Sequence, residues 1–271
     1  MQRKSVKLEV LIAAQNMSSK DQLPPVVGQV VSENCAAVLI NQSKSEASFE
    51  SPSPKLRIFH YPESGISRSR NRALQHAGGD LLLITDDDVE LLDGFSEIIT
   101  DAFDKNPEAD IITFQCLNEH GEKRKNYSDS PFLHNLRTLM RVSSVEIVMR
   151  RESLDRKPLL FDARFGIGSQ IPTGCETVFL SDAHREGFKI LYIPTPIVMH
   201  PDESSGRTLY LNAIMVKAKG GMFSRIFGWK AYGICILFAL KKRKEIGFSL
   251  TKSIGLMFKG IKEFKALDHG K

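Results

Sequence analysis

The sequence has little cysteine, and no two cysteines stand at the spacing of a metal or redox motif. Its four cysteines, Cys35, Cys116, Cys175 and Cys235, lie far apart in a chain of 271 residues. A cysteine-rich zinc site is therefore not expected. The first residues, Met1 to Lys7, are mostly polar and do not resemble a secretory signal. We expect a cytoplasmic protein whose thiols are free.

Long apolar runs, internal repeats and low-complexity tracts are also missing. The most apolar stretch, Ile226 to Leu240, has 15 residues and includes Lys230. A membrane-spanning helix needs about 20 apolar residues, so this stretch is not expected to span. The composition, with 42% apolar and 25% charged residues, is that of an ordinary globular protein. The length suits one large α/β domain, alone or with an appendage.

Acidic residues are scarce in the last part of the chain. The segment Lys217 to Lys271 has 13 Lys and Arg residues but 3 Asp and Glu residues, whereas the whole chain has a net charge of +5. The rest of the chain is therefore net acidic, and the two parts suit different partners. We expect a catalytic domain over residues 1–215 and a basic helical region over residues 216–271.

The basic region has the pattern of an amphipathic helix. After the run Lys241 to Lys244, apolar residues recur at helical spacing from Ile246 to Ile261, with lysines between them. This pattern has two interpretations. In the first, the region binds an anionic membrane surface, which would make the protein peripheral on the inner face of the cell membrane. Alternatively, its helices pack on the catalytic domain and leave a basic face in water. No nucleic-acid motif accompanies the charge, so nucleic acid is not an expected partner.

In the first half of the chain, apolar strands alternate with helices. The predicted strands are 8–14, 36–40, 56–60, 81–85 and 110–114, and the predicted helices are 26–33, 67–76 and 95–103. A further helix is predicted over 176–186, followed by two short extended segments, 190–194 and 197–200. Such alternation predicts an α/β fold with a mostly parallel sheet flanked by helices. In these sheets ligands bind beyond the carboxyl ends of the strands.

Three consecutive aspartates, Asp86, Asp87 and Asp88, follow the apolar strand Leu81 to Thr85. Neighbouring carboxylates raise one another's pKa unless a cation neutralises them. Mg²⁺ and Mn²⁺ prefer such oxygen ligands and keep further sites for substrate phosphates. The other interpretation is a solvated acidic turn, in which Asp88 caps the next helix.

Four motifs occur in an order that resembles the family 2 glycosyltransferases, which have the GT-A fold. They are Gly65-Ile-Ser-Arg-Ser-Arg-Asn-Arg-Ala73, Gly79-Asp80 with Asp86 to Asp88, Phe161-Asp162 to Glu176, and Gly187 to Pro201. Each motif alone is a weak signal, but all four in order are fairly specific. The resemblance implies a GT-A fold, Rossmann-like, with a C-terminal helical appendage.

The resemblance also implies roles for individual residues. Asp86 and Asp88 would bind the metal, and Asp87 would contact the ribose. The metal would stabilise the diphosphate leaving group, and Glu176 would take the proton of the acceptor hydroxyl as general base. A metal and a base on opposite sides of one cleft imply an inverting, single-displacement reaction. The alternative for Glu176 is a helix cap.

Five further positions either have two interpretations or lie where the family contacts the base or carries an acid. The resemblance implies that His200 is a third metal ligand or a contact to the diphosphate, and the alternative is a buried structural histidine. Arg70 either pairs with the nucleotide phosphates or forms a salt bridge to an acid such as Asp80. Asn16 and Gln42 follow two strands where the family contacts the base, but Gln42 replaces a carboxylate. Cys175 likewise stands where the family carries an acid.

The leading hypothesis is a metal-dependent inverting glycosyltransferase that uses Mn²⁺ or Mg²⁺. It would move a sugar from a nucleotide-sugar donor, first of all a UDP-sugar, to a glycan or lipid-linked acceptor in cell-surface polysaccharide synthesis. A catalytically silent glycan- or membrane-binding relative is an alternative. A sugar-phosphate nucleotidyltransferase is another, although Ala13 to Met17 contains no glycine where those enzymes carry a phosphate loop.

Overall fold

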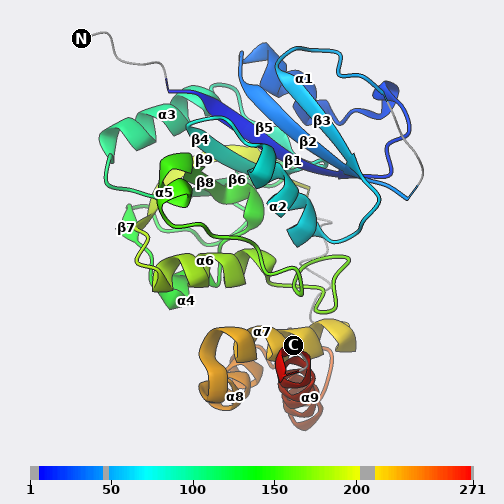
Figure 1. Cartoon of the computed structure of the whole chain (residues 1–271). Coiled ribbons are helices and arrows are strands. Elements are labelled where there is room, and N and C mark those ends of the chain that lie inside the picture. Colours follow the sequence, from blue (N-terminus) through cyan, green and yellow to red (C-terminus); the bar gives the residue numbers. More distant parts are fainter. Residues whose placement is uncertain (1–5, 45–48, 202–210, 270–271) are drawn as a thin grey trace.

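A sheet with helices on both faces forms the body of the molecule in the computed structural model, which describes residues 6–44, 49–201 and 211–269 (Figure 1). Within these residues the sheet order is β3-β2-β1-β4-β8-β6-β9-β5, and β7 pairs with β9. The strands are β1 Leu8–Gln15, β2 Ala36–Gln42, β3 Leu56–Tyr61, β4 Leu81–Asp86, β5 Glu90–Leu91, β6 Ile111–Leu117, β7 Phe132–Leu133, β8 Ile147–Arg150 and β9 Ile190–Met199. The mixed α/β fold expected from the alternation of strands and helices is confirmed.

The first four strands of the order are parallel, and their register brings three strand ends together. Gln15 pairs with Gln42 across β1 and β2, and Ala13 pairs with Asp86 across β1 and β4. The polar residues that follow these strands therefore meet at one edge of the sheet. The second half of the sheet departs from the parallel pattern, because β8 is antiparallel to both β4 and β6.

Alternate residues of the central strands pack on opposite faces of the sheet. On one face, Val10 and Ile12 of β1 pack in a core with α1 Pro25–Ser32 and α3 Phe95–Lys105. On the other face, Leu11 packs in a second core. This second core contains α2 Ile66–His76, α5 Arg151–Arg156 and α6 Cys175–Arg185. A strand buried on both faces reads as a continuous apolar run, as β1 and β4 do.

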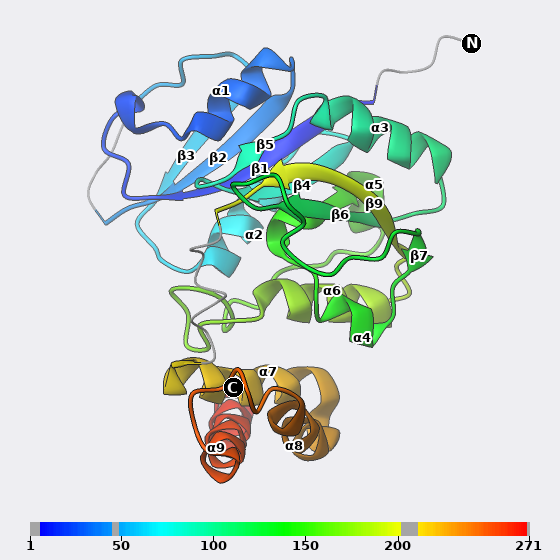
Figure 2. The same cartoon turned by 180° about the vertical axis from the view of Figure 1, so that it is seen from behind.

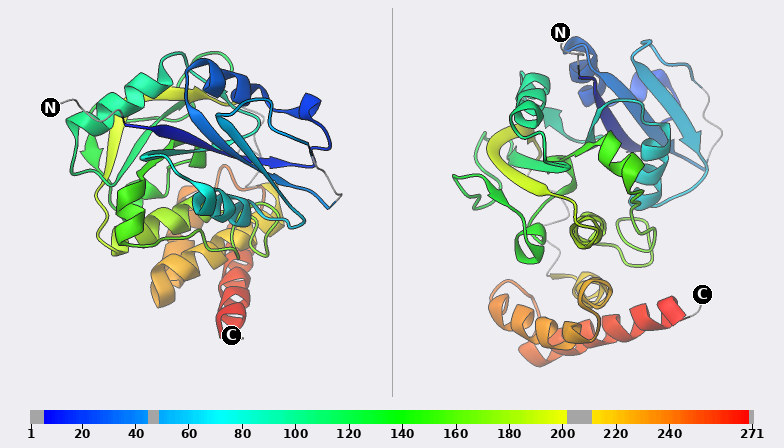
Figure 3. Two further views of the ribbon diagram at one scale, coloured as in Figure 1. Left: turned by 45° about the horizontal axis from the view of Figure 1, so that its top comes forward. Right: turned by 60° about the vertical axis from the view of Figure 1, so that its left-hand side comes forward.

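Three helices form a separate layer beneath α6 (Figures 1 and 2). They are α7 Ala213–Phe227, α8 Ala231–Lys241 and α9 Leu250–His269. α7 lies between the α/β body and the other two helices, as both views and Figure 3 show. The predicted C-terminal helical appendage is thus present. Its predicted start at residue 216 falls within the first turn of α7. The short helices η1 Lys20–Gln22, α4 Leu136–Leu139, η2 Ser144–Glu146 and η4 Gly228–Lys230 complete the assignment.

The apolar helical stretch is longer than the sequence indicated. Ala213–Lys241, with 29 residues, has the length and composition to cross a membrane, and 33% of its most apolar window is buried. This stretch is not one straight helix, because Gly228 has a φ of +57° between α7 and α8. The expectation of 15 apolar residues missed α7, whose sequence mixes small and charged residues with apolar ones.

Candidate active site

A cavity of about 540 Å³ opens at the carboxyl ends of β1, β2 and β4. Its far wall is the segment 166–176, which leads into α6, together with Met215 of α7. Seven of the predicted site residues line it: Gln42, Arg70, Asp86, Asp87, Asp88, Glu176 and His200. These residues are spread along the chain from Gln42 to His200, and the fold brings them to one place.

Asn16 is not among the residues that line the cavity. It follows β1 with a φ of +56°, its side chain is exposed, and its backbone N–H donates to the Gln42 carbonyl at 3.0 Å. The preceding residue, Gln15, lines the cavity instead. The base contact expected for Asn16 therefore has no support in this geometry. Asn41, the neighbour of Gln42, binds both backbone polar groups of Met17 and so fixes the turn after β1.

Arg70 forms an ion pair with Asp86 at the floor of the cavity. Its Nη2 atom lies 2.8 Å from Asp86 Oδ1, and the side chains are 4% and 25% exposed. Burial is the largest influence and works against the charge of Arg70, but Asp86 together with Cys175 and Glu176 outweighs it, so the pKa of Arg70 is raised. Arg70 thus stays charged, and its partner is Asp86 rather than Asp80. The Asp80 carboxylate accepts from the Lys7 backbone N–H at 3.0 Å.

Cys175 connects this ion pair to Glu176. Arg70 Nη1 donates to Cys175 Sγ at 3.0 Å, and the thiol lies 3.1 Å from Glu176 Oε2. Burial, followed by the neighbouring Glu176 carboxylate, raises the pKa of Cys175, so the thiol keeps its proton and donates it to Glu176. The residue that departs from the family pattern is therefore a hydrogen-bond link between the two sides of the cavity.

The other two aspartates lie nearer to solvent. Asp87 is partly buried, and burial together with Asp88 and Asp86 raises its pKa. Asp88 is 64% exposed, and its Oδ1 atom lies 3.6 Å from His200 Nε2. The other ring nitrogen of His200 lies 3.0 Å from the Pro201 carbonyl, to which it donates. Within residues 6–44, 49–201 and 211–269, no three His, Cys, Asp or Glu side chains gather as a metal site. The three predicted ligands thus divide into the pair Asp88 and His200, and Asp86, which binds Arg70.

The local backbone places Glu176 at the cavity. It lies in the first turn of α6, which begins after Gly174 in the left-handed conformation, with a φ of +77°. A side chain on Gly174 would also overlap the sulfur of Met222 in α7. The α6–α7 contact therefore needs glycine at this position. The negative charge of Glu176 acts to raise the pKa of Lys219 in α7, but burial has the larger effect and the pKa of Lys219 is lowered.

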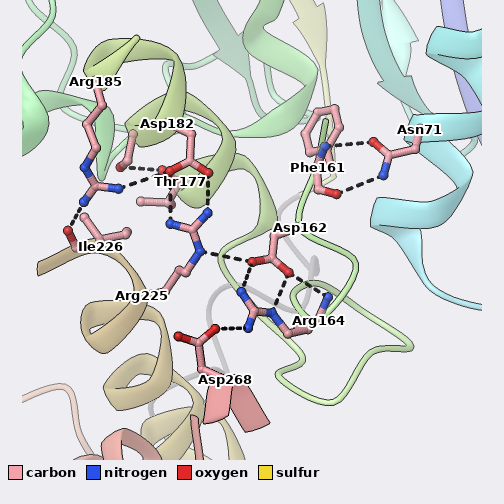
Figure 4. A network of polar contacts seen from close by, with 11 residues as sticks. Asn71, Phe161, Asp162, Arg164, Thr177, Asp182, Arg185, Arg225, Ile226 and Asp268 are labelled. Carbon is pink, nitrogen blue, oxygen red and sulfur yellow. Dashed lines mark hydrogen bonds and ion pairs between the residues drawn. The ribbon is translucent and has the colours of Figure 1, made fainter. Parts of the chain in front are cut away.

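A network of ion pairs holds the segment before Glu176 against the C-terminal helices (Figure 4). Asp162 accepts from Arg164 at 2.6 Å and from Arg225 of α7 at 3.1 Å. Arg225 also binds Asp182 of α6, and Arg164 binds Asp268 of α9, each at 2.6 Å. Burial raises the pKa of Asp162, but the bonds from Arg164 and Arg225 outweigh it and lower the pKa.

The start of the same segment is also held from α2. Asn71 exchanges hydrogen bonds with the backbone of Phe161 at 2.8 and 2.9 Å. The Phe161 ring stacks on Phe179 of α6, with centroids 4.1 Å apart. The segment 161–174 is thus held by α2, α6 and α7 together, which fixes where α6 begins.

Sequence reasoning missed several residues that line the cavity. Ser144 Oγ lies 3.4 Å from Asp86 Oδ2, and Arg124 donates to the Pro201 carbonyl at 3.3 Å. Met215 comes from the C-terminal layer. None of the three belongs to a recognisable motif. Arg124 is the middle one of three consecutive cations, Lys123 to Lys125, and nothing in the sequence distinguishes it from its neighbours.

The fold is of the GT-A type, and comparison with known proteins shows the family. The family model described as "Glycosyl transferase family 2" matches residues 23–176, more than half of the chain. The chain therefore belongs to family 2 of the glycosyl transferases. The resemblance recognised in the sequence and the expected glycosyltransferase activity are confirmed. Curated proteins give no match.

Solved structures of S. aureus TarS share the fold. The structure of TarS 1-349 has a TM-score of 0.60 and 10% identity, and the match covers 96% of this chain and 92% of that one. TarS 1-349 in complex with UDP has a TM-score of 0.61 and 10% identity, and the match covers 96% of this chain and 92% of that one. TarS 1-349 in complex with UDP-GlcNAc has a TM-score of 0.54 and 11% identity, and the match covers 97% of this chain and 84% of that one. The match extends over the C-terminal helices as well as the sheet, so the likeness concerns the whole fold.

Proposed function

We propose that the chain transfers a sugar from a nucleotide-sugar donor to a hydroxyl of a glycan or lipid-linked acceptor. The observation that carries this proposal is that Asp88 and His200 face the same cavity as Glu176. Charge stabilisation on one wall and a carboxylate base on the other are what glycosyl transfer from a diphosphate requires. TarS, which has the same fold, has been solved with UDP and with UDP-GlcNAc, so UDP-sugars are the first donors to test.

The pair Asp88 and His200 fits a hard divalent cation. Because His200 Nδ1 donates to the Pro201 carbonyl, the lone pair of Nε2 faces the Asp88 carboxylate at 3.6 Å. Two lone-pair donors that face each other repel unless a proton or a cation lies between them. Mn²⁺ or Mg²⁺ bound by these two side chains would keep sites for phosphate oxygens and stabilise the charge of the leaving diphosphate. Asp86 supports this site indirectly, by holding Arg70 at the floor.

Glu176 is proposed as the general base. One of its oxygens, Oε2, accepts from the Cys175 thiol, which leaves Oε1 for the acceptor hydroxyl. The base and the Asp88–His200 pair come from different walls of the cavity, so attack and departure would occur on opposite sides of the anomeric carbon. This arrangement favours inversion by a single displacement.

Gln42 and Asp87 are proposed to bind the nucleoside. Gln42 Nε2 donates to the Gly65 carbonyl at 3.2 Å, which fixes the orientation of the amide. Its Oε1 atom is buried and has no hydrogen-bond partner within the described residues. A buried acceptor without a partner is costly, and the N3–H of uracil is a donor that would satisfy it. Asp87 also lines the cavity and would bind the ribose hydroxyls.

Donor binding and turnover with and without the metal test this function. UDP-, GDP- and dTDP-sugars are titrated calorimetrically with Mn²⁺ or with EDTA, and donor hydrolysis is followed in parallel. We expect a UDP-sugar to bind in the presence of Mn²⁺ and to be hydrolysed slowly, and we expect Asp88→Ala to lose both effects. Asp93→Ala is the matched control, because Asp93 is an exposed acid that lies, like Asp88, between β4 and α3.

Three results would contradict the proposal. Turnover that is the same in EDTA would exclude a role for the metal, and a product with retained anomeric configuration would exclude the single displacement. A donor that binds without any turnover would favour the alternative function, a catalytically silent relative. The synthesis of a cell-surface polysaccharide, by a protein on the cytoplasmic side of the membrane, is the setting we propose, because the basic helical region suits an acceptor held at a membrane.

A further inference from the structure

One face of α8 exposes large apolar side chains. Trp229, Ile236, Leu237 and Leu240 are 77%, 39%, 68% and 44% exposed. Their spacing along η4 and α8 places them on one stripe of the helix. The opposite stripe, Ala231, Cys235 and Ala239, is buried. α8 is thus apolar on all sides but covered on one, and a helix of this kind is otherwise found inside a core or a membrane.

The exposed stripe lies on the side of α8 opposite the residues that pack in the core. The buried stripe belongs to the same core as residues of α7 and α9, and α7 lies between these two helices and the sheet (Figures 1 and 3). The exposed stripe is therefore accessible to a large flat partner.

α9, whose sequence pattern suggested a membrane-binding helix, uses its apolar stripe inside the molecule. Met257, Ile261 and Phe264 are buried in the same core as Met222 and Phe223 of α7. Gly220 and Gly260 bring the backbones of the two helices so close that a side chain on either would overlap the other helix. Of the large apolar residues of α9, Leu250 and Leu267 stay exposed, at 38% and 36%, so α8 carries more exposed apolar surface than α9 does.

Basic residues flank the exposed stripe at both ends. Lys230 stands beside Trp229, with its Nζ atom 5.9 Å from the ring centroid. Lys241, Arg243 and Lys244 follow the other end of α8 and are exposed. Lys242 differs, because it pairs with Glu245 at 2.6 Å. Apolar side chains between clusters of cations complement a surface that is apolar inside and anionic at its boundary.

The length of α8 favours a helix that lies on a bilayer. From Trp229 to Lys241 the helix is about 20 Å long, whereas the hydrocarbon core is about 30 Å thick. α7 cannot supply the difference, since Val216, Ala218 and Met222 to Ser224 are buried against the rest of the protein. An interfacial helix needs no such length, because it buries one face by a few ångströms.

We propose that this α8 face, formed by Trp229, Ile236, Leu237 and Leu240 with Lys230, Lys241, Arg243 and Lys244, docks on the surface of an anionic lipid bilayer. Docking would hold the cavity near an acceptor at the membrane, but it does not need the active site. The proposal thus goes beyond the transfer reaction and can be tested separately.

Vesicle flotation of the full chain tests it. The protein is mixed with vesicles of phosphatidylcholine alone, or of phosphatidylcholine with phosphatidylglycerol, and centrifuged. We expect the wild type to float with the anionic vesicles, and high salt to weaken that binding. Trp229→Ser/Leu237→Ser should lower the partition coefficient by about tenfold or more, since two anchors are lost. Leu237→Ser/Leu240→Ser is a second variant that keeps the tryptophan.

The matched control is Leu133→Ser/Leu160→Ser, which removes two leucines of the catalytic body that are 63% and 56% exposed. It should float like the wild type. Lys241→Gln/Arg243→Gln/Lys244→Gln should lose the preference for anionic vesicles and keep the circular dichroism spectrum of the wild type.

The proposal is overturned if the wild type stays in solution with anionic vesicles, or if both serine variants float as the wild type does. Sedimentation velocity distinguishes the other occupant: a dimer that the serine variants dissociate, without vesicle binding, would make the face a contact between two copies. Donor hydrolysis in detergent-free solution should be equal in the wild type and the serine variants. If the wild type floats with anionic vesicles but hydrolyses no donor, the proposed function alone is contradicted.

Discussion

Arg70 and Asp86 are joined at 2.8 Å beneath the cavity, whereas Asp88, two residues further on, reaches toward His200. Asp86 is the last residue of β4, whereas Asp87 and Asp88 lie in the turn that follows it, so the backbone changes direction within the run and the three carboxylates do not face one ligand. The less exposed acid, Asp86, binds a cation of the protein itself, the guanidinium of Arg70. We propose that the more exposed acid, Asp88, binds a cation that arrives with the substrate.

Asp86→Asn and Asp88→Asn should therefore fail in different ways. Asp86→Asn leaves the guanidinium of Arg70 buried without its counter-charge and should cost about 2–3 kcal/mol of stability, since breaking a buried pair is costly and Asp86 is 25% exposed. Asp88→Asn should change stability by less than about 0.5 kcal/mol and lower turnover by about a hundredfold or more. Urea denaturation and donor turnover, measured on both variants, separate the two roles. Equal losses of stability would contradict the division.

Asp87 gives the site a pH dependence. Burial, with Asp88 and Asp86 next, raises its pKa above the ordinary 3.8, so the folded state holds this proton more tightly than the unfolded state. The resulting stabilisation is complete below pH 3.8 and is lost as the pH rises through the raised pKa. Asp87→Asn should consequently melt at a higher temperature than the wild type at neutral pH, and the gap should close in acid.

Asp93→Asn is the control for this measurement, because Asp93 is an exposed acid of the same connection. Its melting temperature should follow that of the wild type at every pH. A wild type that is more stable than Asp87→Asn at neutral pH would show that the carboxylate is not strained by its neighbours.

The regular elements of the sheet could be predicted from the sequence, because a strand buried on both faces is a continuous apolar run. β1 and β4 were predicted within one residue at each end. β9 was predicted as two short segments, since Pro194 and Pro196 interrupt it. In the structure it is one strand, and register shifts against β6 between Thr113 and Cys116 accommodate the prolines.

The site was only partly predictable. The motifs gave the residues at the cavity, because loops after parallel strands meet at one edge. They did not give the Arg70–Asp86 pair or the Cys175 bridge, since both depend on how α2 and α6 approach each other. Lys219 and Met215 lie on α7, and nothing in a helix of mixed small, apolar and charged residues shows that it forms a wall of the site.

Glu176→Gln tests the base. The amide keeps the size of the side chain and can still meet the Cys175 thiol, but it cannot accept the proton of the acceptor hydroxyl. Turnover should fall by about 10²–10⁴-fold while donor affinity changes little, and the acidic limb of the pH–rate profile should disappear. Glu186→Gln, at the exposed end of the same helix, is the control. Unchanged turnover in Glu176→Gln would remove the residue from the mechanism.

Arg225→Met should loosen the C-terminal layer from the catalytic body. Arg225 donates to Asp182 at 2.6 Å and to Asp162 at 3.1 Å with a side chain that is 25% exposed. Losing these bonds should cost about 2 kcal/mol, because Arg164 and Arg185 still bind the two carboxylates. Urea denaturation and limited proteolysis of the α8–α9 connection check this.

The expected pattern is faster cleavage together with a lower kcat, because the segment 161–174 loses its support from α7. Arg243→Met, a substitution on the exposed part of that connection, should leave stability within about 0.5 kcal/mol. Unaltered proteolysis of Arg225→Met would show that apolar packing alone holds the layer.

Gly174→Ala should displace the beginning of α6 and with it Glu176. Two costs add at this position. A φ of +77° strains any residue with a Cβ by about 1–2 kcal/mol, and the overlap with Met222 adds about 1–3 kcal/mol. Gly94→Ala separates them, because Gly94 has a φ of +73° and nothing within 4 Å of an added Cβ. It should show the backbone cost alone and normal turnover. In a Met222→Ala background Gly174→Ala should then cost less by about 1–2 kcal/mol, since the side chain that it overlaps is gone. If the cost is the same in both backgrounds, α7 does not set the position of the proposed base.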